Sequence, residues 1–318
     1  MIEYADFFHY GTIAMSISST SMGVGIGEGI ASHAAIEAMN IQPSAKNEIS
    51  RTAIIGMALI ETAAIMGITV ATMLLLDVKQ DQSPFAGMAE LGIAFSISFS
   101  GFVLGLVSAL PARQAVFSIA RQPFFSQKIF RFMLITQSII QTPIIFGFII
   151  AMLIKNQAAD ATSMADSIRL IASGLCIGLG SIGPAIGLAH FAQQACQDIG
   201  INKNAYNKIF AFTFISEAVI ETPIIFSLII SLLLISSKIH NDSMIQALAM
   251  LASALCIGFG TIGAGIASGT TAAAACHQIA LNPDQHSILT RTSMFAQGLI
   301  DTSAIYCLLI SLILLFFQ

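Results

Sequence analysis

The chain has little of what a water-soluble protein needs on its surface. Only 9% of its 318 residues are charged, 56% are hydrophobic, and Trp is absent. Globular domains carry about a quarter charged residues, so this composition excludes an ordinary soluble fold. The 13 Lys and Arg against 17 Asp and Glu give a net charge of -4, which leaves no basic surface for nucleic acid. Lipid is therefore the expected solvent of this protein.

Long apolar stretches are what the chain has instead. They occupy residues 11–38, 51–76, 88–119, 130–154, 167–197, 209–236, 244–279 and 290–317. About 20 helical residues cross a hydrocarbon core of roughly 30 Å, so each stretch is long enough to span a membrane. The sequence predicts an all-α polytopic membrane protein with eight transmembrane helices.

The chain also repeats itself with a period of 80 residues. One register holds an acid or its amide: Glu61, Gln141, Glu221 and Asp301. The next position holds Thr in every copy: Thr62, Thr142, Thr222 and Thr302. Turn-forming residues at Gln42, Gln122, Asn202 and Asn282 separate two apolar stretches in each copy. Each repeat is therefore predicted to be a helical hairpin, with boundaries at 1–80, 81–160, 161–240 and 241–318.

Basic residues indicate the orientation of these hairpins. Each repeat contains two spans, so all four hairpins insert in the same direction, and we expect them to pack side by side. The turns within hairpins carry most of the basic residues: Lys46, Arg51, Arg113, Arg121, Lys128, Arg131, Lys203, Lys208 and Arg291. The linkers between hairpins carry the other four: Lys79, Lys155, Arg169 and Lys238. Because cytoplasmic loops are rich in Lys and Arg, we expect cytoplasmic turns and both termini outside.

The first helices of the hairpins are rich in glycine. The run Gly23-Val-Gly-Ile-Gly-Glu-Gly29 lies inside an apolar helix and does not have the spacing of a nucleotide-binding loop. In lipid, small residues let helices approach closely enough for van der Waals contact to hold them together. The glycines therefore predict close packing among the first helices.

Five carboxylates lie within the predicted spans: Glu28, Glu61, Glu217, Glu221 and Asp301. A charge at the bilayer centre costs about 2.5–3.5 kcal/mol, so ion handling is the default hypothesis for these residues. Counted from Pro43, Glu28 and Glu61 lie at similar depth, where two carboxylates can share a proton or bind a hard cation. A structural role as protonated helix–helix contacts stays open for both residues.

Two further features neighbour the acid register. Glu217 shares its register with Gln137 and Gln297, one helical turn before the acid, which indicates either a hydrogen-bonding shell or a simple interhelical contact. Pro143 and Pro223 follow the acid register by two residues, and each is expected to kink its helix and free a carbonyl.

These motifs resemble the c subunit, or proteolipid, of the rotary ATP synthases, with four hairpins fused in one chain. The resemblance rests on the glycine-rich first helix, the turn Ala120-Arg121-Gln122-Pro123, and the midmembrane carboxylate followed by Thr. It implies a non-catalytic rotor protein without a cofactor, which forms a closed homo-oligomeric ring in membrane lipid and turns against the a subunit of the ATP synthase stator. Each carboxylate would carry H+ or Na+ and so couple ion flow to ATP synthesis or hydrolysis.

The resemblance also assigns a contact with the central stalk. That contact falls on the turn residues Gln42, Pro43, Arg121, Gln122 and Pro123. The turns at Asn202-Lys203 and Asn282-Pro283 depart from the family pattern. We expect an integral membrane protein of the bacterial inner membrane.

Gln141 departs from the family pattern at the acid register. An amide cannot exchange a proton at accessible pH, but it can still donate and accept hydrogen bonds. The second hairpin is therefore expected to be a degenerate ion site, and the chain to carry three ions on four hairpins.

The identity of the ion depends on the neighbouring ligands. In the family, sodium sites combine the carboxylate with Gln or Glu on the first helix, an adjacent hydroxyl, and Tyr five residues on. The first hairpin offers Glu28, Glu61 and Thr62, with Met66 at the Tyr position. The third has Leu188 on its first helix, beside Glu221 and Thr222. The fourth has Ser268 there and offers Asp301, Thr302, Ser303 and Tyr306.

The fourth hairpin of one copy beside the first of the next would give a fuller ligand set, which favours Na+ slightly over H+. Two other classes use the same residues differently. A self-contained cation transporter or channel would use the same carboxylates and would differ in quaternary structure. A structural scaffold would have no use for repeated midmembrane acids.

Overall fold

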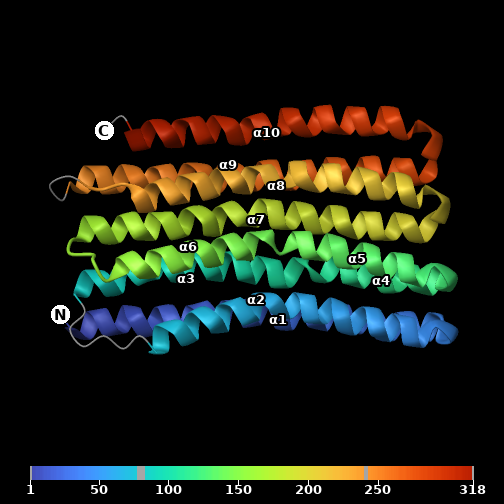
Figure 1. Cartoon of the computed structure of the whole chain (residues 1–318), viewed down its shortest axis with the longest axis horizontal. Helices are drawn as coiled ribbons and strands as arrows, with labels where there is room; N and C mark the ends of the chain where they lie inside the picture. Colours follow the sequence, from blue (N-terminus) through green and yellow to red (C-terminus); the bar gives the residue numbers. More distant parts are fainter. Residues whose placement is uncertain (1, 77–82, 240–242, 317–318) are drawn as a thin grey trace.

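The computed structural model describes residues 2–76, 83–239 and 243–316, and these form helices joined by short turns (Figure 1). Hairpin 1 consists of α1 (Ile2–Ile41) and α2 (Lys46–Leu76), hairpin 3 of α7 (Met164–Ile201) and α8 (Tyr206–Ser236), and hairpin 4 of α9 (Met244–Leu281) and α10 (His286–Phe316). Hairpin 2 is made of α3 (Pro84–Val107), α4 (Ala109–Arg121), α5 (Ser126–Ile140) and α6 (Thr142–Ala158). The all-α fold of four hairpins is confirmed.

Each hairpin turn contains one short 3-10 helix that follows the turn-forming register. These segments are Pro43–Ala45, Pro123–Phe125, Lys203–Ala205 and Pro283–Gln285. The turns lie together at one end of the bundle, and α1 begins and α10 ends at the other end (Figure 1). The hairpins therefore run parallel to one another in chain order.

Seven helical segments of the described chain are long and apolar enough to cross a membrane. They are Pro43–Leu76, Pro84–Arg121, Pro123–Ala158, Met164–Ile201, Lys203–Ser236, Met244–Leu281 and Pro283–Phe316. The eighth helix, α1, is more polar because it carries Glu28 and a run of Ser and Thr, yet it packs along α2 and α3 as its counterparts do.

The first helices form one closely packed layer, in which α1 meets α3, α3 meets α7, and α7 meets α9. Glycine makes this approach possible. A Cβ atom at Gly27 would collide with the carbonyl oxygen of Gly105, and one at Gly187 would collide with that of Gly265. Backbone therefore touches backbone between neighbouring hairpins, and small residues at these positions are a condition of the packing.

Both helices of hairpin 2 are interrupted near the middle of the membrane. The first breaks at Ser108, three residues before Pro111, and the second breaks at Gln141, two residues before Pro143. Proline has no N–H, so it leaves the carbonyl four residues earlier without its helical partner. The Thr142 hydroxyl donates to the carbonyl that Pro143 leaves free, that of Ile139, at 2.8 Å. In hairpin 3, α8 continues through Pro223 without interruption.

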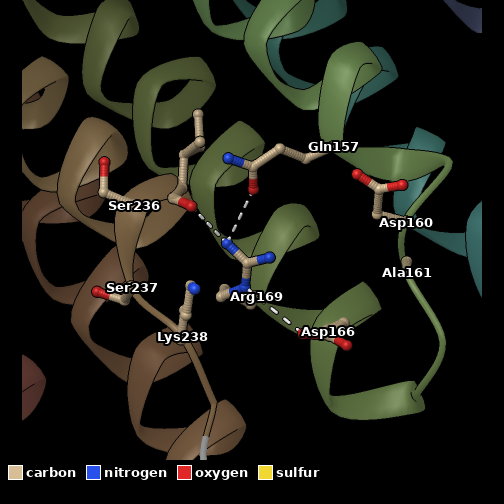
Figure 2. Close-up of a pocket in the computed structure, with 9 residues that line it drawn as sticks. Gln157, Asp160, Ala161, Asp166, Arg169, Ser236, Ser237 and Lys238 are labelled. Atoms are coloured by element: carbon tan, nitrogen blue, oxygen red, sulfur yellow. Dashed lines mark hydrogen bonds and ion pairs between the residues drawn. The ribbon is translucent and has the colours of Figure 1, made fainter.

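Arg169 is placed differently from the sequence interpretation, which put it in a linker with Lys79, Lys155 and Lys238. It lies in the second turn of α7, is 8% exposed, and donates through Nη1 to the carbonyls of Leu234 and Ile235 and to the Gln157 side chain (Figure 2). A guanidinium is a suitable partner for the last carbonyls of a helix, here α8. Arg169 therefore closes the end of α8, and Lys79 lies outside the described residues.

Candidate functional site

The acid register lies midway along the second helices and meets a different environment in each hairpin. Glu61 is exposed, Gln141 and Asp301 are each 7% exposed, and Glu221 is half-buried. The three covered positions have a preceding hairpin in the chain, and the exposed position has none. The register therefore faces the boundary with the preceding hairpin.

Gln141 shows the geometry of this boundary. The Thr62 hydroxyl, on α2, contacts Gln141 Oε1 at 2.6 Å, and Gln141 Nε2 donates to the Leu59 carbonyl at 3.1 Å. The amide thus uses its acceptor and its donor on the same helix of hairpin 1. A neutral polar link of this kind satisfies Gln141 without any ion.

The next boundary repeats the arrangement with a carboxylate. The Thr142 side chain lies close enough to the Glu221 carboxyl to interact with it, although its hydroxyl donates to the Ile139 carbonyl. Glu221 Oε1 is buried without a partner in the described chain, and the same is true of Asp301 Oδ1. The side chain of Asp301 is one carbon shorter than that of Glu, which limits its reach across the boundary to Thr222. The boundary between hairpins 2 and 3 thus brings an acid near the Thr of the hairpin before it, whereas Asp301 makes no such contact among the described residues.

The other predicted ligands of hairpin 4 do not gather at Asp301. Thr302 and Ser303 donate to the carbonyls of Leu299 and Ile300 in their own helix, and Tyr306 is 68% exposed. Successive helical residues are rotated by about 100°, so side chains one, two and five positions after Asp301 leave its face. Thr222 likewise donates to the Ala218 carbonyl. The hydroxyls of Thr302, Ser303 and Tyr306 therefore lie off the face of α10 that Asp301 occupies.

Glu28 does lie near Glu61, as the depth argument predicts. It is partly buried on α1, and the charges of the two carboxylates are close enough to interact. Glu61 itself is exposed, because hairpin 1 is the first of the described hairpins. The pair stands at the open edge of the four-hairpin array.

The side chains one helical turn before the acid register are buried in hairpins 2, 3 and 4. Gln137, Glu217 and Gln297 are each 1% exposed or less. Gln137 Nε2 donates to the carbonyls of Gly56 and Ser108, both at 3.0 Å. The two Glu217 oxygens have no hydrogen-bond partner in the described chain.

The predicted stalk residues lie in the exposed turns. Gln122 Nε2 donates to the Gly200 carbonyl at 2.9 Å, and Asn202 makes the matching bond to the Ala280 carbonyl at 2.8 Å. Gln42 instead donates to Ser44. Arg121, Gln122 and Pro123 line a surface pocket of about 440 Å³ together with Phe124, Phe125 and Lys203. The turn amides therefore also link neighbouring hairpins.

Two polar pairs between hairpins, each with a buried acid and a less buried histidine, are absent from the sequence predictions. His9 Nδ1 contacts Glu90 at 2.6 Å between α1 and α3, and His277 Nδ1 contacts the fully buried Asp198 at 2.8 Å between α7 and α9. Their partners are separated by 81 and 79 residues, close to the repeat period. That spacing, searched between unlike residues, is the signal that could have identified both pairs.

Comparison with known proteins decides the family. The family model of the ATP synthase C subunit matches four segments, at residues 12–74, 91–154, 171–234 and 251–314. The chain belongs to the ATP synthase c-subunit family. It is therefore a non-catalytic, membrane-integral rotor protein of a rotary ATP synthase, and not a self-contained transporter.

Individual relatives agree with this assignment. The ATP synthase c subunit of Dehalococcoides mccartyi is 45% identical over 71 residues, which are 22% of this chain and 93% of that protein. The ATP synthase c subunit of Cereibacter sphaeroides that is numbered 2 is 39% identical over 72 residues, 23% and 87% of the two chains. The K subunit of the A-type ATP synthase of Methanocaldococcus jannaschii is 24% identical over 233 residues, 72% of this chain and 96% of that one. The chain is thus similar to small rotor proteins over one repeat and to a longer one over most of its length.

Proposed function

We propose that this rotor protein carries one monovalent cation on each of Glu61, Glu221 and Asp301. The contact of Thr62 with Gln141 at 2.6 Å carries the proposal, because it puts the acid register at the boundary between hairpins. A loaded carboxylate is neutral and can pass lipid, whereas the empty anion cannot. A boundary site therefore couples loading of the ion to rotation past lipid.

The open edges of the chain support a closed ring of identical copies. Gly105 and Gly265 meet the backbone of the preceding hairpin, while Gly25, in the same register, has nothing within 4 Å. Gly183 meets the backbone of the following hairpin, and Gly263, in its register, also faces open space. Head-to-tail contacts of this kind close into rings. A second copy is the partner that both edges fit.

Ring closure completes the site at Glu61. The boundary rule seen at Gln141 and Glu221 would place Thr302 and Tyr306 of one copy beside Glu61 and Glu28 of the next. This set has two carboxylates and two hydroxyls, and a hard cation prefers several such oxygens. We assign Na+ to this site. Ser303, on the same exposed face, is a further hydroxyl for it.

Hairpin 2 is the inert member of the set. Both ends of the Gln141 amide are occupied by hairpin 1, and an amide does not exchange protons. The chain would then move three ions for four hairpins. Fewer ions per turn require a larger driving force for synthesis, which favours ATP-driven pumping.

The position of the turns suggests how the ring meets its partners. The basic residues gather at the turn end, so we place the turns in the cytoplasm of a bacterial cell and the termini outside. There the exposed Phe124, with Arg121 and Pro123, offers a surface for the central stalk. The a subunit of the stator would then pass the second helices at the level of the acids. The four units of this rotor are proposed to be residues 1–80, 81–160, 161–240 and 241–318.

Site-resolved carbodiimide labelling tests the proposal. In the intact complex we expect adducts on Glu61, Glu221 and Asp301, and protection of Glu61 by added Na+. The Gln141 peptide serves as the internal blank. Failure of Na+ to protect Glu61 would leave H+ as the ion, and absence of all three adducts would remove the ion-carrying role itself.

A further inference from the structure

Glu217 is a buried acid that the proposed cycle leaves unused. Its side chain is 1% exposed in the middle of α8, and neither carboxyl oxygen has a hydrogen-bond partner in the part of the chain described. Burying a polar group without a partner is costly, and burying an isolated charge is far more costly. Such a residue requires either a proton or a bound ligand.

The repeat shows what Glu217 faces. In hairpin 2 its counterpart, Gln137, donates to the Ser108 carbonyl at 3.0 Å. In hairpin 4 the counterpart, Gln297, accepts from the Ser268 hydroxyl at 3.3 Å. Ser108 and Ser268 share the register of Glu28 on the first helix. The register of Glu217 therefore meets the register of Glu28 within hairpins 2 and 4.

The acid changes place between these two registers from hairpin 1 to hairpin 3. Hairpin 1 has Glu28 on the first helix and Met57 on the second. Hairpin 3 has Leu188 on the first helix and Glu217 on the second. Each hairpin with Glu at the acid register thus has one further acid at this pair of positions. Glu217 supplies the second carboxyl that Leu188 cannot.

Glu217 is also one helical turn from Glu221, and side chains at this spacing are neighbours, with Cβ atoms about 5–6 Å apart. The two charges are close enough to interact. We propose that Glu217 and Glu221 form a two-carboxyl site that binds one monovalent cation, an inference that rests on the proposed ion-carrying role of Glu221.

The charge balance of this site follows from its burial. Two carboxylates one turn apart in a buried site do not both ionise, so the empty pair keeps one proton and carries one negative charge. Binding of H+ gives two neutral acids. Binding of Na+ gives one carboxylate, one acid and one metal ion, which also sum to zero. One cation is exchanged in either case, so the chain still carries three.

A purely structural Glu217 would behave differently. It would act as a neutral hydrogen-bonding group equivalent to Gln137 and Gln297, would not react with carbodiimide, and would not respond to the transported ion. Because Gln stands at this register in two hairpins, Glu217→Gln is expected to assemble. It is therefore a matched control for fold and packing.

The test is carbodiimide labelling of the intact complex, read peptide by peptide. In Glu221→Gln rings we expect the adduct to move to Glu217, and the cation that protects Glu61 in the same sample to protect Glu217. In Glu217→Gln rings the adduct stays on Glu221. Reactive Glu61 and Asp301 beside an unmodified Glu217 in the Glu221→Gln ring would overturn the proposal.

Should the Glu221→Gln ring fail to assemble, Glu217→Leu answers the same question. The cation concentration that half-protects Glu221 is expected to rise about tenfold, as is common when a group beside an ion ligand is lost. The cation concentration that half-protects Glu61 should not change. An unchanged value at Glu221 would contradict a shared site, whereas loss of labelling at Glu61 in the unaltered chain would count against the proposed function instead.

Discussion

Hairpins 2 and 3 have the same repeat length and the same Thr-Pro pair after the acid register, yet they place different polar groups at that register. Hairpin 2 has Gln141, fully bonded to hairpin 1, and both of its helices are interrupted at that level. Hairpin 3 has Glu221 and Glu217 with unpartnered oxygens in the described chain, on helices that run unbroken. A neutral link can be satisfied by protein alone, whereas an ion carrier must keep oxygens free for its ion. Under the proposed function, this difference separates a structural hairpin from an ion-carrying one.

The largest effect is expected where hairpin 3 packs backbone against backbone. Gly187 has no room for a Cβ beside Gly265, whereas hairpin 2 has Val107 at this register and its helix ends there. Gly187→Leu should separate hairpins 3 and 4 and abolish most ring assembly, measured by native gel or mass spectrometry. Gly298→Leu is the matched control, because Gly298 faces open space on α10. Normal rings from Gly187→Leu would contradict close glycine packing.

The second prediction concerns replacing the acids of hairpin 3 by the amide that hairpin 2 has at the acid register. Glu221→Gln combined with Glu217→Gln should leave the ring assembled and lower the number of ions moved per ATP by about a third, because two amides carry no exchangeable ion. The measurement is the ion-to-ATP ratio in reconstituted vesicles. An unchanged ratio would show that hairpin 3 is not an ion carrier.

The reverse conversion should change the ratio by a similar amount in the opposite direction. Gln141→Glu adds a carboxyl beside Thr62, and its protonated form can still donate to the Leu59 carbonyl, so the ring should assemble. The same ratio is expected to rise by about a third if the new site loads and unloads. A new carbodiimide adduct at residue 141 is the independent check, and its absence would mean that the interrupted helices of hairpin 2 prevent ion access.

The smallest effect concerns the link between hairpins 1 and 2. Thr62→Val removes the hydroxyl that contacts Gln141 Oε1 and should destabilise this boundary by about 1 kcal/mol, the usual size of such interhelical bonds. Thermal dissociation of the ring in detergent measures it. Thr69→Val is the control, since Thr69 donates to the Ile65 carbonyl of its own helix. Equal loss in both variants would mean that the contact between hairpins adds nothing.

The period of 80 residues was enough to predict the hairpins, their parallel order and the family, because turn residues and apolar lengths are local properties. It also predicted the acid register and the proximity of Glu28 to Glu61. It could not predict that Thr62 pairs with Gln141 of the next hairpin, since that depends on the stagger between hairpins. Nor did it distinguish Ser108 and Gln141 as helix breaks, because Pro223 follows the same motif without one.

Polar contacts between different helices do not follow from the sequence patterns. Arg169 was assigned to a linker by its position in the sequence, but α7 begins at Met164 and carries the guanidinium under the end of α8. His277 and Asp198 share no register, so a search for repeats between like residues passed over them. Contacts between unlike positions of neighbouring repeats require the three-dimensional packing.

Three of the four hairpins are proposed to carry ions, and the hairpin with Gln141 is not. The most direct test is the number of ions moved per ATP by the purified complex, compared with the number of hairpins counted from the symmetry of its ring. We predict a ratio that corresponds to three ions for every four hairpins. A ratio that corresponds to one ion for every hairpin would contradict the proposal.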